Sequence, residues 1–228
     1  MFLQGERVVL KIINPFLRST LYKELSSLYL YPGDDALSDL KSRKDEVAML
    51  FEELTSQISS PIVENVDLLI SSINDLSFPD VQVEYVRLFD YRPLSPPYES
   101  AYVKMQNPSD TPANMEISIK ELYQKYGLKR SDAFKEPPDH IALELEFMHF
   151  LTFSEGHSSE KSKKDAETYL KAEKEFLENH LLKWVPTFCN TLGEVTKLRF
   201  FNLLSSLTKN FISQDANYVK EVLARCHS

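Results

Sequence analysis

Glycine is scarce in this chain. Only five of its 228 residues are glycine, and each is isolated in the sequence. A soluble protein of this length would carry about sixteen at the usual frequency of ~7%. The glycine-rich phosphate-binding turns of dinucleotide-binding and P-loop folds need several glycines at fixed spacing, and no such motif is present. The sequence therefore argues against a doubly wound α/β enzyme.

Apolar residues recur at helical spacing through most of the chain. Leu21, Leu25 and Leu28, for example, share one face of a predicted helix that ends before Pro32 and Gly33. In the stretch VQVEYV apolar and polar residues alternate, so this stretch would also fit a β-strand. We predict an all-α fold, a single compact domain of about ten helices over residues 1–228. The helices expected after the first cover 34–59 (a short one, then a longer one), 61–76, 81–89, 115–126 (ending at Gly127), 138–153, 165–183, and two or three more up to 226.

Proline and polar residues mark the expected loops. Three prolines within five residues of YRPLSPPYESAY, and two more in the polar segment that follows, predict irregular structure near 90–114. The polar run SEGHSSEKSKKD predicts a second loop at 154–165, and residues 1–15 are expected to be irregular.

Composition and charge limit the classes of function. The chain is 43% hydrophobic and 26% charged, as in soluble globular proteins, and its net charge of −8 disfavours nucleic-acid binding. No apolar run approaches the ~18 residues of a membrane span. The opening MFLQGERVVLKIINPF lacks the features of a signal peptide, and two cysteines make neither a disulfide framework nor a zinc cluster. We expect a cytoplasmic protein with no nucleic-acid partner and no membrane insertion.

The stretch KEPPDHIALELEFMHFL, residues 135–151, carries the residues most suggestive of chemistry. A metal site is not expected, because nine helical residues place His149 about 180° from His140. A serine or cysteine hydrolase lacks its nucleophile motif, and adjacent Asp139 and His140 would project about 100° apart on a helix. General acid–base chemistry by His140 with Glu144, in a small helical hydrolase, stays open.

The same residues have a structural interpretation. Pro137 or Pro138 suits the first turn of a helix, and Asp139 in that turn complements the helix dipole. His140 and Glu144 could then form a surface pair. Glu144, however, lies in a strongly apolar stretch, and a buried carboxylate requires a partner.

The string EPPDHIALELEFM resembles the signature of the redox-enzyme maturation chaperones, the TorD/DmsD/NarJ family, in which a Pro-x-Asp-His motif opens a helix. Three further blocks agree in the same order: YVRLF at 85–89, PPYESAY at 96–102 and FLENHLLKWVPTFC at 176–189. Together the blocks extend from residue 85 to residue 189.

The resemblance implies an all-helical, TorD-like cytoplasmic chaperone and not an enzyme. Family members bind the twin-arginine signal peptide, and often the folded body, of a molybdopterin-containing oxidoreductase precursor. They delay its export until the cofactor is inserted. The client would carry the molybdopterin, and the chaperone itself would need no metal or cofactor. Weak guanine-nucleotide binding and a dimer in place of the monomer stay open. The alternatives are a nitrate-reductase-type assembly factor that acts on the enzyme body, and a helical scaffold without a peptide groove.

The resemblance also implies which residues bind peptide. The family's hot spot carries over to Asp139 and His140, with Tyr98, Glu99 and Ser100 nearby. Two guanidiniums followed by an apolar stretch call for carboxylates beside an apolar groove. The carboxylates would come from Asp139, Glu99 and Glu144, and the apolar surface from Tyr98, Tyr102, Phe147 and Leu94. Trp184 and Pro186 are expected as a core residue and a helix-start residue.

Overall fold

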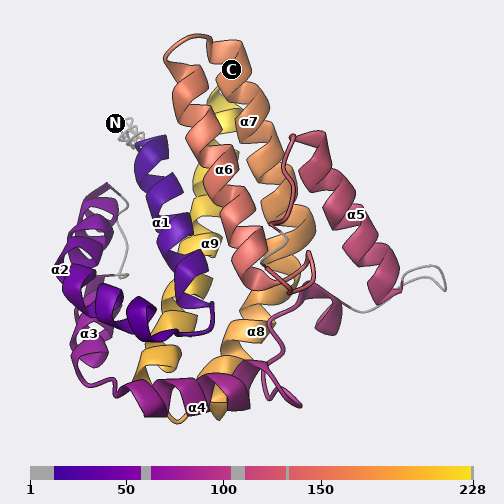
Figure 1. Cartoon of the computed structure of the whole chain (residues 1–228). Coiled ribbons are helices and arrows are strands. Elements are labelled where there is room, and N and C mark those ends of the chain that lie inside the picture. Colours follow the sequence, from indigo (N-terminus) through magenta and orange to yellow (C-terminus); the bar gives the residue numbers. More distant parts are fainter. Residues whose placement is uncertain (1–12, 58–62, 104–110, 132–133, 227–228) are drawn as a thin grey trace, which may run out of the picture.

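The structure is a computed structural model that describes residues 13–57, 63–103, 111–131 and 134–226 (Figure 1). Over these residues the chain forms nine α-helices, one 3₁₀ turn and one π turn, and no β-strand, which confirms the all-α prediction. The elements are α1 (Pro15–Leu28), α2 (Asp34–Gln57), α3 (Val63–Asn74), α4 (Phe78–Phe89), η1 (Glu99–Ala101), α5 (Pro112–Lys125), α6 (Ile141–Ser159), α7 (Lys163–Phe176), η2 (Leu177–Leu181), α8 (Leu182–Val195) and α9 (Arg199–Cys226).

Five helices, α1, α6, α7, α8 and α9, form the body of the molecule. Helix α1 packs on α6, α6 on α7, and both α7 and α8 on α9. Helices α2 and α3 pair with each other and reach the body through α1 and α9. Figure 1 shows α4 crossing below this body and α5 standing beside it, on the side opposite α2 and α3. None of the described helices combines the length and the hydropathy that crossing a membrane requires.

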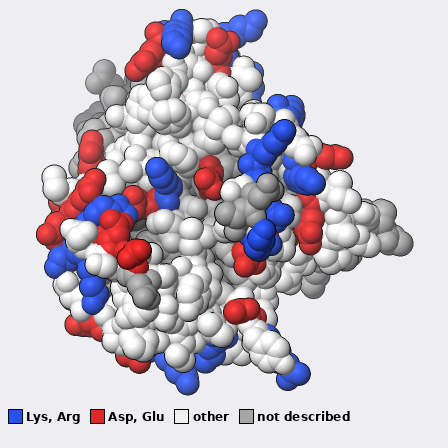
Figure 2. All heavy atoms as spheres, viewed as in Figure 1, with Lys and Arg blue, Asp and Glu red and all other residues white. Residues whose placement is uncertain are grey.

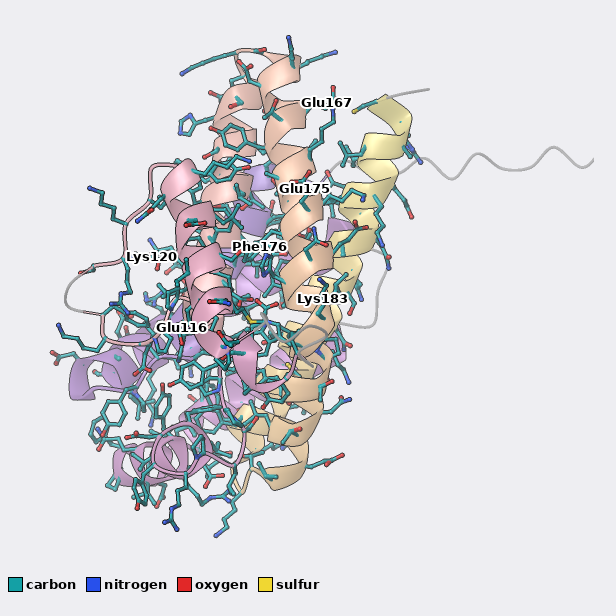
Figure 3. The ribbon with its side chains drawn as sticks, turned by 90° about the vertical axis from the view of Figure 1, so that its right-hand side faces the viewer. Glu116, Lys120, Glu167, Glu175, Phe176 and Lys183 are labelled. Carbon is teal, nitrogen blue, oxygen red and sulfur yellow. The ribbon has the colours of Figure 1, made fainter. Side chains whose placement is uncertain are left out.

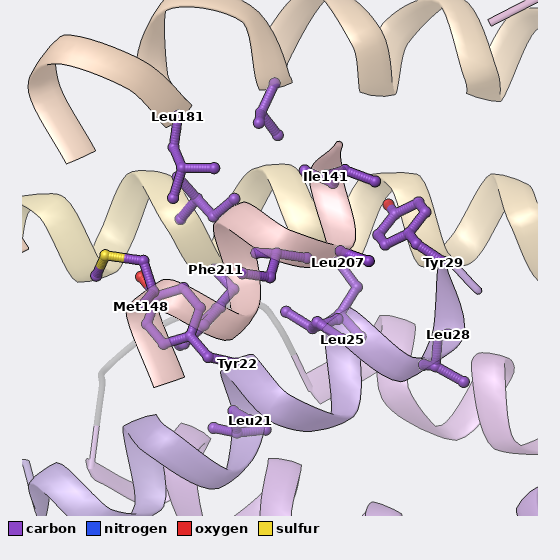
Figure 4. Close-up of a cluster of buried hydrophobic side chains, with 14 of the residues drawn as sticks. Leu21, Tyr22, Leu25, Leu28, Tyr29, Ile141, Met148, Leu181, Leu207 and Phe211 are labelled. Atoms are coloured by element: carbon purple, nitrogen blue, oxygen red, sulfur yellow. The ribbon is translucent and has the colours of Figure 1, made fainter. Parts of the chain in front are cut away.

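The core lies where α1, α6 and α9 meet (Figure 4). Leu21 and Leu25 of α1 are fully buried, as the helical spacing of the sequence predicts. The ring of Tyr22 packs on Phe211 of α9 with their centroids 4.8 Å apart, and Met148 of α6 is buried in the same cluster. This core joins segments that are far apart in the sequence.

A buried ion cluster ties the same helices together. Arg18 of α1 is completely buried and donates through Nε and Nη2 to the carboxylate of Asp215, at 2.6 and 2.9 Å. Its guanidinium also contacts Glu155 at 2.8 Å and Glu173 at 2.5 Å. The hydroxyl of Tyr22 donates to Asp215 at 2.7 Å. One cation therefore holds carboxylates from α6, α7 and α9, and burial with like charges nearby raises the pKa of both Glu155 and Glu173.

Two boundaries predicted from the sequence are wrong. Residues 34–57 form one helix and not two, because Leu37, Leu40 and Val47 continue a single buried stripe. The expected loop at 154–165 is mostly helix, because α6 continues to Ser159 and α7 begins at Lys163. Tertiary contacts stabilise the end of α6: Glu155 binds Arg18, and Gly156 lets the ring of Phe16 approach to 2.8 Å from where a Cβ would stand.

The helix expected over 165–183 is part of a longer helical run. Helix α7 passes through the π turn η2 directly into α8, and Pro186 lies inside α8 instead of at a helix start. Proline lacks the N–H that the carbonyl four residues earlier would bind, so the regular ladder is interrupted here. Trp184 and Phe188 are fully buried on either side of Pro186. Their burial explains why the helix continues past the proline.

A buried polar cluster beneath a row of tyrosines

The turn before η1 docks on the start of α6, and this junction joins two of the sequence blocks. Tyr98 and His140 form an antiparallel backbone bridge. The amide of Glu99 donates to the carbonyl of Asp139 at 3.0 Å, and the amide of Ser100 donates to Asp139 Oδ2 at 3.0 Å. The prediction that residues 98–100 lie near Asp139 and His140 is therefore confirmed, while their binding of a peptide stays a prediction.

His140, and not a proline, caps α6. Its Nδ1 accepts the amide of Ala142 at 3.1 Å, and the helix begins at the next residue, Ile141. Pro138 and Asp139 thus precede the helix, so their expected place in its first turn is wrong. The side chain of Asp139 accepts a hydrogen bond from the Ser100 amide and does not interact with the helix dipole. Burial lowers the pKa of His140 to about 4, which keeps the ring neutral and Nδ1 available as an acceptor at pH 7.

A cluster of buried polar side chains lies behind the junction. Glu99, Asp139 and Glu144 are each no more than 2% exposed. Trp184 of α8 donates through Nε1 to Glu144 Oε2 at 3.0 Å, and His180 Nδ1 lies 2.9 Å from Glu99 Oε2. The expected surface pair of His140 and Glu144 is wrong, because both side chains are inside the protein. Three of the four sequence blocks meet in this cluster.

The cluster brings three carboxyl groups, those of Glu99, Asp139 and Glu144, together inside the protein. Burial and the charges of Glu99 and Asp139 raise the pKa of Glu144 well above its usual value, while the bond from Trp184 opposes this. Among the described residues, Glu144 Oε1 and Asp139 Oδ1 have no hydrogen-bond partner. A proton held on Glu144 relieves the repulsion between carboxylates that burial would otherwise amplify. Over the same residues, no group of His, Cys, Asp and Glu side chains could hold a metal ion.

The bond between Trp184 and Glu144 gives a testable coupling. We expect Trp184→Phe to lower the free energy of unfolding by about 1–3 kcal/mol, because it leaves a buried carboxyl oxygen without its donor. In a Glu144→Leu background the same change should cost less, since no carboxyl remains to be orphaned. A double-mutant cycle from urea unfolding should yield a coupling above ~1 kcal/mol, and a coupling near zero would contradict this assignment.

Three tyrosines lead from the junction to the surface, and we call Tyr31, Tyr85 and Tyr98 the tyrosine row. The Tyr98 ring lies 5.5 Å from the His140 ring, and its hydroxyl donates to Glu136 Oε2 at 2.7 Å. Tyr85 and Tyr31 pack edge to face with centroids 5.4 Å apart. The pKa values of Tyr85 and Tyr98 are raised, first by burial and then by nearby carboxylates that include Glu136. The row is therefore an aromatic surface with a negative edge.

A mostly apolar pocket adjoins the tyrosine row. Tyr31 is 52% exposed and Leu94 is 46% exposed. A pocket of about 220 Å³ opens between α1, α2 and α4, and Leu30, Tyr31 and Tyr85 line it together with buried core residues. Figure 2 shows wide uncharged surface on the face that α1 and α4 present, with single acidic and basic side chains among it. This face offers a ligand a mostly apolar hollow, whose charged residues Asp39 and Arg43 pair with each other, and the carboxylate of Glu136 beside Tyr98.

The structure separates the residues expected to bind peptide into two groups. Tyr98, Ser100 and Tyr102 are partly exposed, and Leu94 is exposed. The other expected residues, Glu99, Asp139, His140, Glu144 and Phe147, are buried, and none is more than 2% exposed.

Sequence reasoning missed Glu136, Tyr85 and His180 as site residues. Glu136 stands directly before the two prolines of the motif, and His180 lies inside a block that matched the family. Their positions beside matched motifs were the available signal. Only the fold brings their side chains to the tyrosine row and the buried cluster.

Comparisons with known proteins identify a family and several similar chaperones. The family described as "Nitrate reductase delta subunit" matches residues 41–190. Chaperone protein TorD of Vibrio cholerae (strain O395) is 27% identical over 96% of this chain and 98% of its own length. TorD of Photobacterium profundum is 30% identical over 68% of this chain and 74% of its own length.

Two further proteins are similar. The perchlorate reductase assembly chaperone protein of Dechloromonas aromatica is 28% identical over 67% of this chain and 66% of its own length. The crystal structure of a redox-enzyme maturation protein from Archaeoglobus fulgidus superposes with a TM-score of 0.47 at 20% identity, over 93% of this chain and 96% of that one. The family match covers most of the chain, and the relatives are named chaperones. The chain therefore belongs to the nitrate reductase delta subunit family, and within it to the TorD-like chaperones rather than to a class of enzymes.

Proposed function

We propose that this chaperone binds the twin-arginine signal peptide of a molybdopterin-containing oxidoreductase precursor in the cytoplasm. It holds the precursor back from export until the cofactor is inserted. The observation that supports this most directly is the tyrosine row with Glu136 at its edge, beside an apolar pocket of about 220 Å³.

The chemistry of the row suits such a peptide. A guanidinium binds carboxylates through forked N–H donors and stacks on tyrosine faces. Burial raises the pKa of Tyr85, and the charges of Glu136 and Asp90 raise it further. Glu136 also accepts the hydroxyl of Tyr98, so carboxylates act on the tyrosine row. The apolar stretch after the arginines would lie over Leu30 and Leu94, with one side chain in the pocket.

The buried cluster supports this surface from behind. Asp139 and His140 fix the turn that carries Tyr98, through the Ser100 amide and the backbone bridge. A preorganised surface loses less entropy on binding than a flexible one. Asp139 and His140 thus act as positioning residues, and their substitution would weaken peptide binding without any direct contact.

The experiment is a titration of a fluorescein-labelled twin-arginine peptide, followed by fluorescence anisotropy. Asp90→Asn combined with Glu136→Gln should weaken binding about tenfold or more, because two charged acceptors are lost while their shapes are kept. A peptide with two lysines in place of the arginines should bind less tightly than the original, since lysine cannot form the forked contact.

Glu146→Gln is the matched control, because Glu146 is an exposed carboxylate of α6 on the wall of a different pocket. It should leave the affinity unchanged. Equal affinity of the double variant and the wild type would remove the tyrosine row from the site. A precursor that binds equally well without its leader would favour the assembly factor that acts on the enzyme body.

A further inference from the structure

The loop between α5 and α6 forms a second, very different surface. Together with α5 it encloses a pocket of about 570 Å³, with Tyr123 and Pro138 among its walls. Four basic side chains line this pocket against one acidic side chain, Glu116; the basic ones are Lys120, Lys129, Arg130 and Lys135. The whole chain carries a net charge of −8, so the positive charge of this pocket is opposite in sign to that of the protein as a whole.

Figure 2 shows basic side chains gathered on the part of this face where the loop runs. In Figure 3, Lys120 projects from α5 on the side away from Glu175 and Phe176 of α7. Lys120 and Lys129 are both exposed. Arg130 is anchored, because its Nη1 donates to the backbone carbonyl of Glu136. The floor is also fixed, since the Tyr123 hydroxyl donates to the carbonyl of Pro138 at 3.0 Å.

An apolar pocket of about 490 Å³ continues from the basic one. The two share Tyr123, Leu128, Lys129, Arg130 and Leu143, so they form one groove. Lys120 and Lys135 line only its basic end, and Lys129 and Arg130 stand where the basic end passes into the apolar one. Phe134 and Phe150 line the apolar half, and Phe153 at its far end is 43% exposed; Glu146 is its acidic residue. We call this combined surface the basic groove.

The basic groove does not suit a twin-arginine sequence. Its lysines and arginine would repel two guanidiniums, whereas the tyrosine row offers carboxylates. The two surfaces meet at Glu136: its side chain faces Tyr98 and its carbonyl holds Arg130. The acidic and the basic surface therefore lie next to each other and are joined through this one residue.

Resting on the proposed function, in which a precursor protein is the client, we propose that the basic groove binds an acidic segment of the client's folded body. That segment carries several carboxylates followed by aromatic or aliphatic residues. The carboxylates pair with Lys120, Lys129 and Arg130, and the apolar residues cover Phe150 and Phe153. The charge complementarity of the two halves sets the direction in which the segment lies.

A labelled peptide of four aspartates followed by Leu-Phe-Leu-Phe, titrated into the full chain at low salt, tests this proposal. Lys120→Gln with Lys129→Gln should weaken binding roughly five- to tenfold, and added salt should weaken it further. Lys163→Gln with Lys164→Gln is the matched control, because these lysines are exposed at the start of α7, outside the groove. That control should bind as the wild type does.

Four results would overturn the proposal. The first is unchanged binding after the Lys120 and Lys129 substitutions, and the second is an equal loss in the Lys163 and Lys164 control. The third is equal binding of a peptide with the four aspartates but no apolar tail, and the fourth is full competition by inorganic phosphate. Either of the last two would show a site for small anions only. Twin-arginine peptide binding should be unchanged in the Lys120 and Lys129 variant. Failure of the basic groove is thus distinguishable from failure of the tyrosine row.

Discussion

Replacing Arg18 by methionine should lower the free energy of unfolding by about 3–5 kcal/mol, because it leaves buried carboxylates without their cation. Asp215 and Glu173 are fully buried, and Glu155 nearly so. Methionine fills a similar volume, so most of the loss would be electrostatic and not a packing defect. Urea unfolding of the wild type and the variant at pH 7 measures the difference.

Arg43→Met is the matched control for this effect. Arg43 also contacts two carboxylates, Glu24 at 3.2 Å and Asp39 at 2.7 Å, but about a third of its side chain is exposed. Solvent screens such pairs, and the expected loss is below ~1 kcal/mol. In the Arg18 variant, acidification should restore part of the lost stability, because the orphaned carboxyls would then take up protons. A loss in the Arg18→Met protein no larger than in the control would contradict the assigned role.

Acidification should act on the wild type through His140. Its pKa in the folded protein is about 4, against an ordinary value of 6.5. The unfolded chain therefore binds a proton between these two values while the folded chain does not. The contribution to stability is fully present above pH 6.5 and is lost as the pH falls through about 4. The difference between the two pKa values corresponds to about 3 kcal/mol.

His140→Asn isolates this contribution. Asparagine can cap α6 through its side-chain oxygen and does not titrate. Glu144, Glu155 and Glu173 have raised pKa values, so their protonation has the opposite sign and stabilises the folded state as the pH falls. These carboxyls are present in both proteins and cancel in the comparison. Urea unfolding should show His140→Asn gaining on the wild type between pH 6.5 and 4; parallel stability curves would show that His140 is not kept neutral by the fold.

Periodicity alone predicted much of the fold. The stripe of Leu21, Leu25 and Leu28 is buried, and Gly127 follows α5 with a φ of 76°, as expected of a residue that ends a helix. The meeting of the Tyr98 and His140 segments followed from matched motifs. Sequence patterns were therefore sufficient to predict features that are set within one helix, such as its buried face and the residue at which it ends.

Patterns failed where the deciding partner lies elsewhere in the chain. Arg18 lies on the same helix face as Tyr22 and Leu25, which indicated that it is buried. The neighbouring sequence, however, does not show which three carboxylates pair with its guanidinium. Glu155 and Gly156 look like loop residues until α1 packs on them. Glu144 and Glu99, which were expected to meet a peptide, likewise bind partners far along the chain, Trp184 of α8 and His180 of η2.

The ion cluster around Arg18 also constrains the order of events when the chain is made. Arg18 and Asp215 are 197 residues apart, and Ile13 and Tyr218, which also bond, are 205 apart. During synthesis from the N-terminus, α1 emerges with a charged guanidinium on its core face and no partner for it until α9 follows. Contacts of such long sequence separation slow folding, because a long loop must close before they form. We therefore expect α1 to reach its final packing only after α9 has been made.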